Sequence, residues 1–98
     1  MQFGLSTEDI NKIKEIIVRF PEIERVIIYG SRAKGNYKPS SDIDLTLVGE
    51  KLTLTLLQTL ENEIDDLLLP YKFDISIFHQ ISNPDLIAHI ERVGKEFI

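Results

Sequence analysis

Two aspartates separated by one isoleucine, Asp42 and Asp44, begin an apolar run, DIDLTLV. Successive side chains of a β-strand point to opposite faces, so both carboxylates would share one face, while Ile43 and Leu45 would share the other. A third acid, Asp74, interrupts a second alternating run, KFDISIF. If the two runs form neighbouring strands, we expect the three carboxylates to lie close together.

Such a group of carboxylates predicts a metal site. Two unit charges about 5 Å apart repel by roughly 3 kcal/mol at an effective dielectric constant of about 20, so the group is unfavourable without a bound cation. The chain has no cysteine, and its two histidines do not stand at metal-ligand spacing, which leaves oxygen ligands. Oxygen ligands suit Mg²⁺ or Mn²⁺, and a pair of such ions supports in-line phosphoryl or nucleotidyl transfer.

Gly30 and Ser31, upstream of the aspartates, indicate a phosphate site. Glycine lets the backbone approach a phosphate closely, N–H groups at a turn or helix start bind anions, and the Ser31 hydroxyl adds a donor. Arg32 and Lys34 follow and are placed to neutralise more of a triphosphate. The segment from Gly30 to Asp44 therefore predicts a phosphate site at one end and a metal site at the other.

Six elements are expected to position these residues, in the order αββαβα and in a single domain over residues 1–98. The first helix begins at Ser6 and keeps apolar residues at helical spacing as far as Phe20. The second is lined by leucines from Leu56 to Leu68 and ends before Pro70. The strands are predicted at residues 25–29, 42–48 and 72–78.

The connection between the first two strands carries turn residues and is predicted as a loop, in which residues 31–34 form at most one helical turn. The last helix is expected to open at Asn83 and Pro84, because asparagine caps helices and proline suits their first turn. Four apolar residues would share its inner face, at positions Leu86, Ile90, Val93 and Phe97.

Composition limits the classes of partner. Hydrophobic residues make up 43% of the chain and charged residues 28%, which is typical of a folded globular protein. The net charge of -5 opposes attraction to a nucleic-acid backbone, so long nucleic acid is not an expected partner. No apolar run approaches the roughly 20 residues of a membrane span, and the start lacks the features of a secretory signal. We therefore expect a cytoplasmic protein without a membrane partner.

The motif resembles that of a known family. Gly30-Ser31, a ten-residue spacer (32–41), the acid pair around Ile43 and the later strand acid Asp74 resemble the minimal nucleotidyltransferase domains of the DNA polymerase β-like superfamily. The resemblance implies an α+β fold, in which helices pack on a small mixed β-sheet. It also implies transfer of a nucleoside monophosphate from a nucleoside triphosphate to an acceptor hydroxyl, with two Mg²⁺ ions and ATP as cosubstrate.

By the same resemblance, Asp42 and Asp44 ligate the metals, and Asp74 ligates one of them and draws the proton from the acceptor. Gly30, Ser31 and Arg32 would hold the triphosphate.

Stand-alone proteins of this kind are paired with HEPN-type ribonuclease toxins. The resemblance therefore implies an MntA-type antitoxin that moves AMP from ATP onto a tyrosine hydroxyl of such a toxin. Two alternatives stay open on the sequence: a non-catalytic antitoxin that neutralises its partner by binding, and a nucleotidyltransferase of a small-molecule acceptor such as an aminoglycoside. No residue pattern selects the nucleobase.

Overall fold

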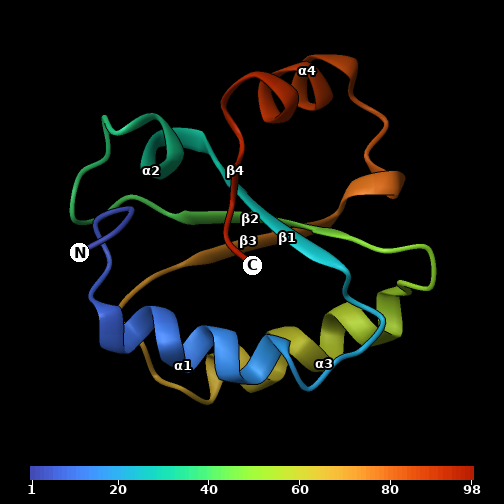
Figure 1. Ribbon diagram of the computed structural model, residues 1–98, viewed down its shortest axis with the longest axis horizontal. Coiled ribbons are helices and arrows are strands. Elements are labelled where there is room, and N and C mark those ends of the chain that lie inside the picture. Colours follow the sequence, from blue (N-terminus) through green and yellow to red (C-terminus); the bar gives the residue numbers. More distant parts are fainter.

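A four-stranded mixed sheet runs through the centre of the molecule, in a computed structural model that describes residues 1–98 (Figure 1). The strand order is β3-β2-β1-β4, with β1 antiparallel to both of its neighbours and β2 parallel to β3. The strands are β1 (Arg25–Tyr29), β2 (Ile43–Val48), β3 (Phe73–Ile77) and β4 (Lys95–Glu96).

Helices cover both faces of this sheet (Figure 1). On one face lie α1 (Thr7–Ile17) and α3 (Leu54–Asp65), and on the other lie the short α2 (Gly30–Lys34) and α4 (Pro84–Val93). A 3₁₀ turn, η1 (Phe78–Gln80), follows β3. None of these helices is both long and apolar enough to cross a membrane.

The three longer helices each begin at a side-chain cap, which satisfies backbone N–H groups that have no partner within the helix. Ser6 accepts from the N–H of Asp9 at 3.1 Å, and Asn83 accepts from the N–H of Asp85 at 2.9 Å. Both caps confirm the predicted helix starts. Thr53 caps α3 in the same way, a start that we did not predict.

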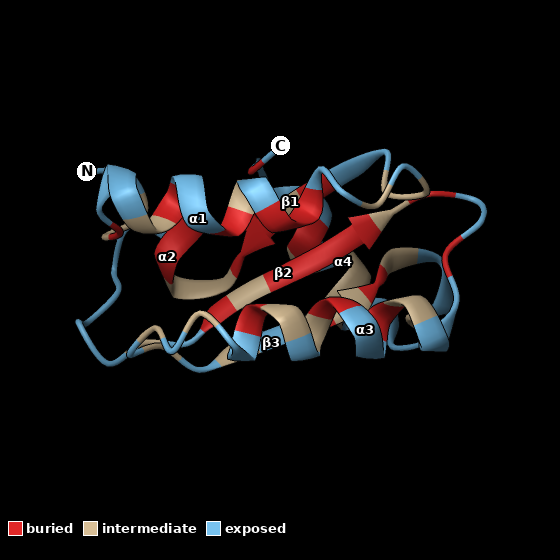
Figure 2. Ribbon diagram, turned by 90° about the horizontal axis from the view of Figure 1, so that it is seen from below, coloured by how far each residue is buried: buried red, intermediate tan, exposed pale blue.

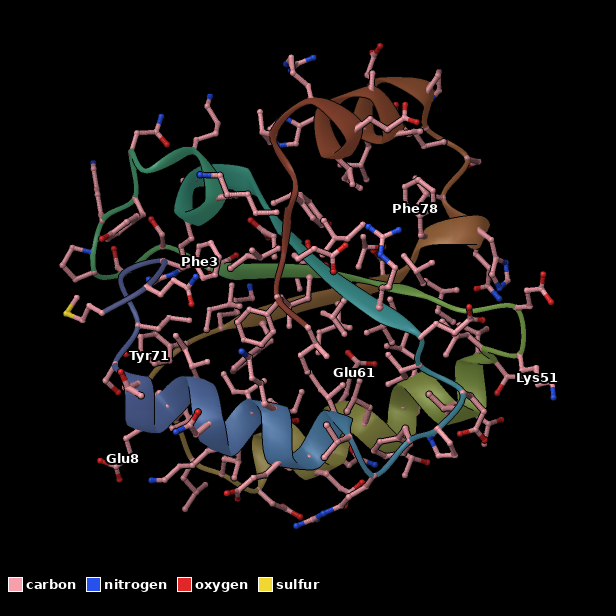
Figure 3. All side chains as sticks on the ribbon, in the orientation of Figure 1. Phe3, Glu8, Lys51, Glu61, Tyr71 and Phe78 are labelled. Carbon is pink, nitrogen blue, oxygen red and sulfur yellow. The ribbon has the colours of Figure 1, made fainter.

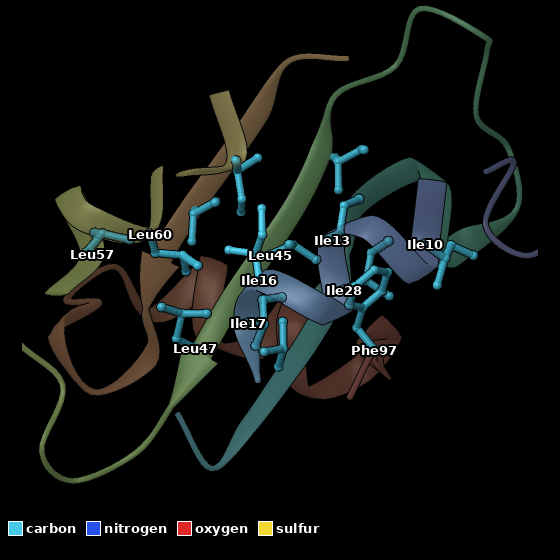
Figure 4. Close-up of a cluster of buried hydrophobic side chains, with 14 of the residues drawn as sticks. Ile10, Ile13, Ile16, Ile17, Ile28, Leu45, Leu47, Leu57, Leu60 and Phe97 are labelled. Carbon is cyan, nitrogen blue, oxygen red and sulfur yellow. The ribbon is translucent and has the colours of Figure 1, made fainter. Parts of the chain in front are cut away.

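Alternate strand residues form the core between the sheet, α1 and α3 (Figure 4). Ile28, Leu45 and Leu47 are fully buried at 0% exposure and pack with Ile13 and Leu60 of the two helices. Each of these helices has a buried stripe toward the sheet and an exposed stripe away from it (Figure 2). Burying each such side chain contributes about 1.5–3 kcal/mol, so this face carries most of the stability.

The predicted αββαβα order is confirmed, and α2 confirms the single helical turn within the loop. The predicted helix ends are too long: Phe20 lies in the turns after α1, and Leu68 lies beyond α3 with a left-handed φ of 55°. The α+β architecture, with helices packed on a small mixed sheet, is as predicted.

The placement of Phe97 in the last helix is wrong. Helix α4 ends at Val93, and Gly94 then passes so close to β1 that an added Cβ would lie 2.7 Å from Cγ2 of Ile27. The next two residues pair with β1 as β4, and Phe97 reaches the core only after that strand, with 4% exposure. Backbone pairing with β1 therefore replaces the last helical turn.

Candidate active site

The strand register places three polar side chains next to one another at one end of the sheet. Tyr29 of β1 pairs with Asp44 of β2, which in turn pairs with Asp74 of β3. Their chain neighbours Ile28, Leu45 and Ile75 are buried in the α1 and α3 core, so these three side chains point to the opposite face, toward α2 and α4. The predicted approach of Asp44 to Asp74 follows directly from the parallel β2 and β3.

Asp42 stands one residue before β2, beside this group. The pKa of Asp44 is raised from 3.8 to about 6, first by burial and then by the negative charges of Asp74 and Asp42, while the positive charge of Arg32 acts in the opposite direction. Asp42 and Asp74 are therefore both within electrostatic reach of Asp44.

These carboxylates fit a divalent cation without forming a closed ligand cage. No three His, Cys, Asp or Glu side chains are gathered closely enough to hold an ion by themselves. Asp42 and Asp74 are exposed and Asp44 is half-buried, so coordination positions stay open for substrate oxygens. The donors are all oxygen, and Arg32 offsets their mutual repulsion only in part, which is the chemistry that suits Mg²⁺. Asp42, Asp44 and Asp74 are the residues that would hold it.

Gly30 is required at the start of α2 for two reasons that the structure makes explicit. Its φ of 73° lies in the left-handed region, and an added Cβ would lie 2.3 Å from Oδ2 of Asp44. No side chain caps this helix start, and Ser31 is half-buried beside it. The predicted phosphate end of the motif, at Gly30, and its metal end, at Asp44, are therefore adjacent in space, with no room for a side chain between them.

Comparison with known proteins bears on this arrangement. Residues 11–98 match the family model described as "Polymerase beta, Nucleotidyltransferase". The chain belongs to this nucleotidyltransferase family. A curated relative from Methanocaldococcus jannaschii, named "Putative protein adenylyltransferase MJ1217", is 34% identical over 85 residues, which cover 86% of each chain.

Solved structures similar to this nucleotidyltransferase share its fold. A chain in a crystal structure described as a toxin-antitoxin with AMP-PNP superimposes with a TM-score of 0.73 at 20% identity, over 91% of this chain and 72% of that one. A second, from a tri-AMPylated Shewanella oneidensis HEPN toxin in complex with MNT antitoxin, has a TM-score of 0.69 at 17% identity, over 96% and 72%. At these identities the two likenesses show a shared fold.

Arg32 of the nucleotidyltransferase does not occupy the predicted place. Its side chain is buried, with 2% exposure, and its guanidinium donates to the backbone carbonyls of Phe3, Pro39 and Ser41. A side chain engaged in this way does not face a triphosphate at Gly30 and Ser31. We therefore withdraw Arg32 as a phosphate ligand. Lys34, two residues on, is exposed and remains available for that role.

Three further residues of the nucleotidyltransferase site were missed by the sequence analysis. Tyr29 is 6% exposed, and burial raises the pKa of its hydroxyl; the nearby Ser76 lowers it in part, and the charges of Asp74 and Asp44 raise it further. Behind it, the hydroxyl of Ser76 donates to that of the fully buried Thr46 at 2.9 Å. Only the alternation of β1, β2 and β3 could have placed these three on the acidic face.

Proposed function

We propose that this nucleotidyltransferase is a Mg²⁺-dependent protein adenylyltransferase that moves AMP from ATP onto a tyrosine hydroxyl of a HEPN-type toxin and so acts as an antitoxin. The observation that carries the proposal is the adjacency of Gly30, Asp44 and Asp74 across the register of β1, β2 and β3. The relative named as a protein adenylyltransferase supports the choice of acceptor class. The structural neighbours that are toxin-antitoxin complexes support the partner.

The chemistry assigned to each residue follows from its place. Gly30 and Ser31 bind the triphosphate of ATP through the uncapped start of α2 and the Ser31 hydroxyl. Asp42, Asp44 and Asp74 would hold two Mg²⁺ ions, which would supply positive charge to neutralise the α-phosphate and the leaving pyrophosphate. The acceptor oxygen forms a bond to the α-phosphorus, and the bond from that phosphorus to the bridging oxygen of pyrophosphate breaks.

Asp74 takes the proton of the acceptor hydroxyl. It is exposed on the edge strand β3, so an acceptor on another protein reaches it from solvent without a rearrangement of the sheet. Tyr29, by contrast, is buried beneath the site and is not itself a candidate acceptor. ATP is a cytoplasmic nucleotide, and we place the reaction in the cytoplasm.

Intact-mass measurement tests the proposal. A purified HEPN-type toxin is incubated with the protein, ATP and Mg²⁺, and we expect a mass gain of one or more AMP units on a tyrosine. Chelation of Mg²⁺ should abolish the gain. An unmodified toxin that is nevertheless inhibited would favour neutralisation by binding, and ATP consumption with an aminoglycoside and no toxin would favour a small-molecule acceptor. Either of these results would contradict the proposed function.

A further inference from the structure

Arg32 is a buried cation with no carboxylate partner. Its 2% exposure would cost several kcal/mol for an unpaired charge, so the charge must be stabilised by other groups. Four hydrogen bonds do this, all to backbone carbonyl oxygens. Nε and Nη2 both donate to Ser41, at 3.1 and 2.9 Å, Nη1 donates to Phe3 at 2.9 Å, and Nη2 also donates to Pro39 at 3.3 Å.

Two tyrosine rings flank the same guanidinium. Its central carbon lies 5.5 Å from the ring centre of Tyr37 and 5.3 Å from that of Tyr71, within the range of cation–π attraction. Figure 3 shows Phe3 and Tyr71 at the same end of the molecule, on the left of the view, with Tyr71 beside the start of α1. Segments from three parts of the chain therefore meet at one arginine: the N-terminal turn, the connection from α2 to β2, and the segment that leads into β3.

The N-terminal turn is shaped to make this contact. Gln2 and Leu5 pair as a β-bridge, and both intervening residues, Phe3 and Gly4, have left-handed φ values of 57° and 71°. A Cβ added at Gly4 would lie 2.3 Å from the ring of Tyr37 and 2.9 Å from Nη1 of Arg32. Gly4 therefore lets the turn approach closely enough for the Phe3 carbonyl to accept from the guanidinium.

The contact at Ser41 bears directly on Asp42. The Ser41 carbonyl belongs to the peptide group before Asp42 and accepts two N–H groups from Arg32. The peptide group after Asp42 is held as well, because the N–H of Ile43 donates to the carbonyl of Lys72 at 2.8 Å. Peptide groups are planar, so holding both of them restricts φ and ψ of the residue between and sets the direction of its Cα–Cβ bond.

We propose that Arg32 is a positioning residue that orients Asp42 for metal binding before substrate arrives. The proposal rests on the proposed function, in which Asp42 is a metal ligand. Asp42 lies outside β2, so the strand ladder does not fix it from its N-terminal side, and Arg32 supplies the missing constraint. A lysine cannot replace it, because an ammonium group lacks the planar fork that reaches three carbonyl oxygens at once.

The test substitutes Arg32→Lys, which keeps the charge and removes the fork. Mn²⁺ binding is measured by electron paramagnetic resonance, and hydrogen exchange is followed for the amides of residues 36–43, both well below the unfolding temperature. We expect affinity for Mn²⁺ to fall about tenfold, as for other residues that orient metal ligands, and exchange in this segment to become faster. A core variant with a similar loss of Tm, Ile64→Val or Leu60→Ala, is the matched control and should leave both readouts unchanged.

Gly4→Ala is the second variant, for the case in which Arg32→Lys does not fold. It acts at the half-buried N-terminal turn and should draw the Phe3 carbonyl away from Arg32, with a smaller fall in Mn²⁺ affinity and faster exchange. Wild-type affinity and exchange in folded Arg32→Lys, or in Gly4→Ala if only that variant folds, would overturn the role of Arg32. If the wild-type protein itself binds no Mn²⁺, the proposed function fails instead, and the exchange of residues 36–43 alone decides whether Arg32 orders this segment.

Discussion

The two faces of the sheet are made by the same strands, but one face forms the apolar core and the other carries the candidate active site. On the face covered by α1 and α3, Ile28, Leu45 and Leu47 are fully buried in one apolar cluster. On the face toward α2 and α4, their chain neighbours include Tyr29, Asp44 and Thr46. Because alternate residues serve alternate faces, stability and chemistry can be changed separately within one strand.

Among the variants that separate the two faces, Asp44→Asn is expected to have the largest effect, on the rate of AMP transfer. A neutral amide removes a proposed metal ligand and should lower the rate of AMP transfer by about 10³-fold or more, equivalent to about 4 kcal/mol. The free energy of unfolding should rise or stay level, because repulsion from Asp42 and Asp74 is relieved. The rate is followed by toxin mass gain, and unfolding by urea titration.

Asp65→Asn, the same change at an exposed position of α3, is the control and should alter neither quantity. Full activity in Asp44→Asn would show that the acidic face is not catalytic.

The converse change is Leu45→Ala, one residue along the same strand. Removing this fully buried side chain should reduce the free energy of unfolding by about 3 kcal/mol, within the range of 2–5 kcal/mol typical of core leucines. Transfer per folded molecule should change little at temperatures where the variant is folded. Val48→Ala, on the opposite face and only half-buried, should cost less. A loss of activity in Leu45→Ala at constant folded fraction would mean that the two faces are coupled.

Gly30→Ala tests the position where the backbone of α2 comes closest to the Asp44 carboxylate. Its cost has two parts, a positive φ and a collision with Oδ2 of Asp44, and we expect about 2 kcal/mol of destabilisation together with weaker Mn²⁺ binding. Gly35→Ala is a matched control, because Gly35 has a φ of 90° and no atom within 4 Å of an added Cβ. It should show the backbone cost alone, about 1 kcal/mol, with Mn²⁺ affinity unchanged. If the two variants lost the same stability and bound Mn²⁺ equally well, close contact between Gly30 and Asp44 would not matter for metal binding.

The smallest effect is a dependence of stability on pH. The pKa of Asp44 is raised from 3.8 to about 6 in the folded protein, so between these values the folded state binds more protons than the unfolded state. The free energy of unfolding of the metal-free protein should therefore fall as pH rises from about 4 to 6, by about 1–2 kcal/mol after solvent screening is allowed for.

Urea titrations across this range check the dependence, with and without Mg²⁺. Bound Mg²⁺ favours the ionised carboxylate and should reduce the slope, as should Asp44→Asn. A wild-type slope that persists in Asp44→Asn would assign the titration to another group.

Local patterns predicted much of the fold. Strand β1 was placed at its observed bounds from RVIIY, and the caps at Ser6 and Asn83 were read from residue type. Phe97 was misplaced, because its spacing from Ile90 and Val93 is helical while its position is set by pairing of β4 with β1. Such pairing joins residues about 70 apart in the chain, which periodicity cannot detect.

Local patterns predicted some residues of the candidate site, and long-range contacts determined the others. Asp42, Asp44 and Asp74 could be selected because acids in apolar strands are unusual at any register. Arg32 was assigned to phosphate from its place beside Ser31, and only the three-dimensional arrangement shows that it donates to carbonyls of the N-terminal turn and of the connection from α2 to β2. The sequence around Tyr29 and Ser76 does not mark them as site residues. They belong to the site because strand pairing places them beside Asp44 and Thr46.

Asp74 has a consequence for solubility as well. Strand β3 forms one edge of the sheet, so one row of its backbone N–H and C=O groups has no strand beside it. The residues around Asp74 are mostly apolar and β-branched or aromatic, a composition that favours growth of the sheet by addition of a further chain. A carboxylate near the start of that edge strand discourages such growth. Replacing it with valine would therefore be expected to produce aggregates as well as an inactive protein, and recovery of the variant in soluble form should be measured first.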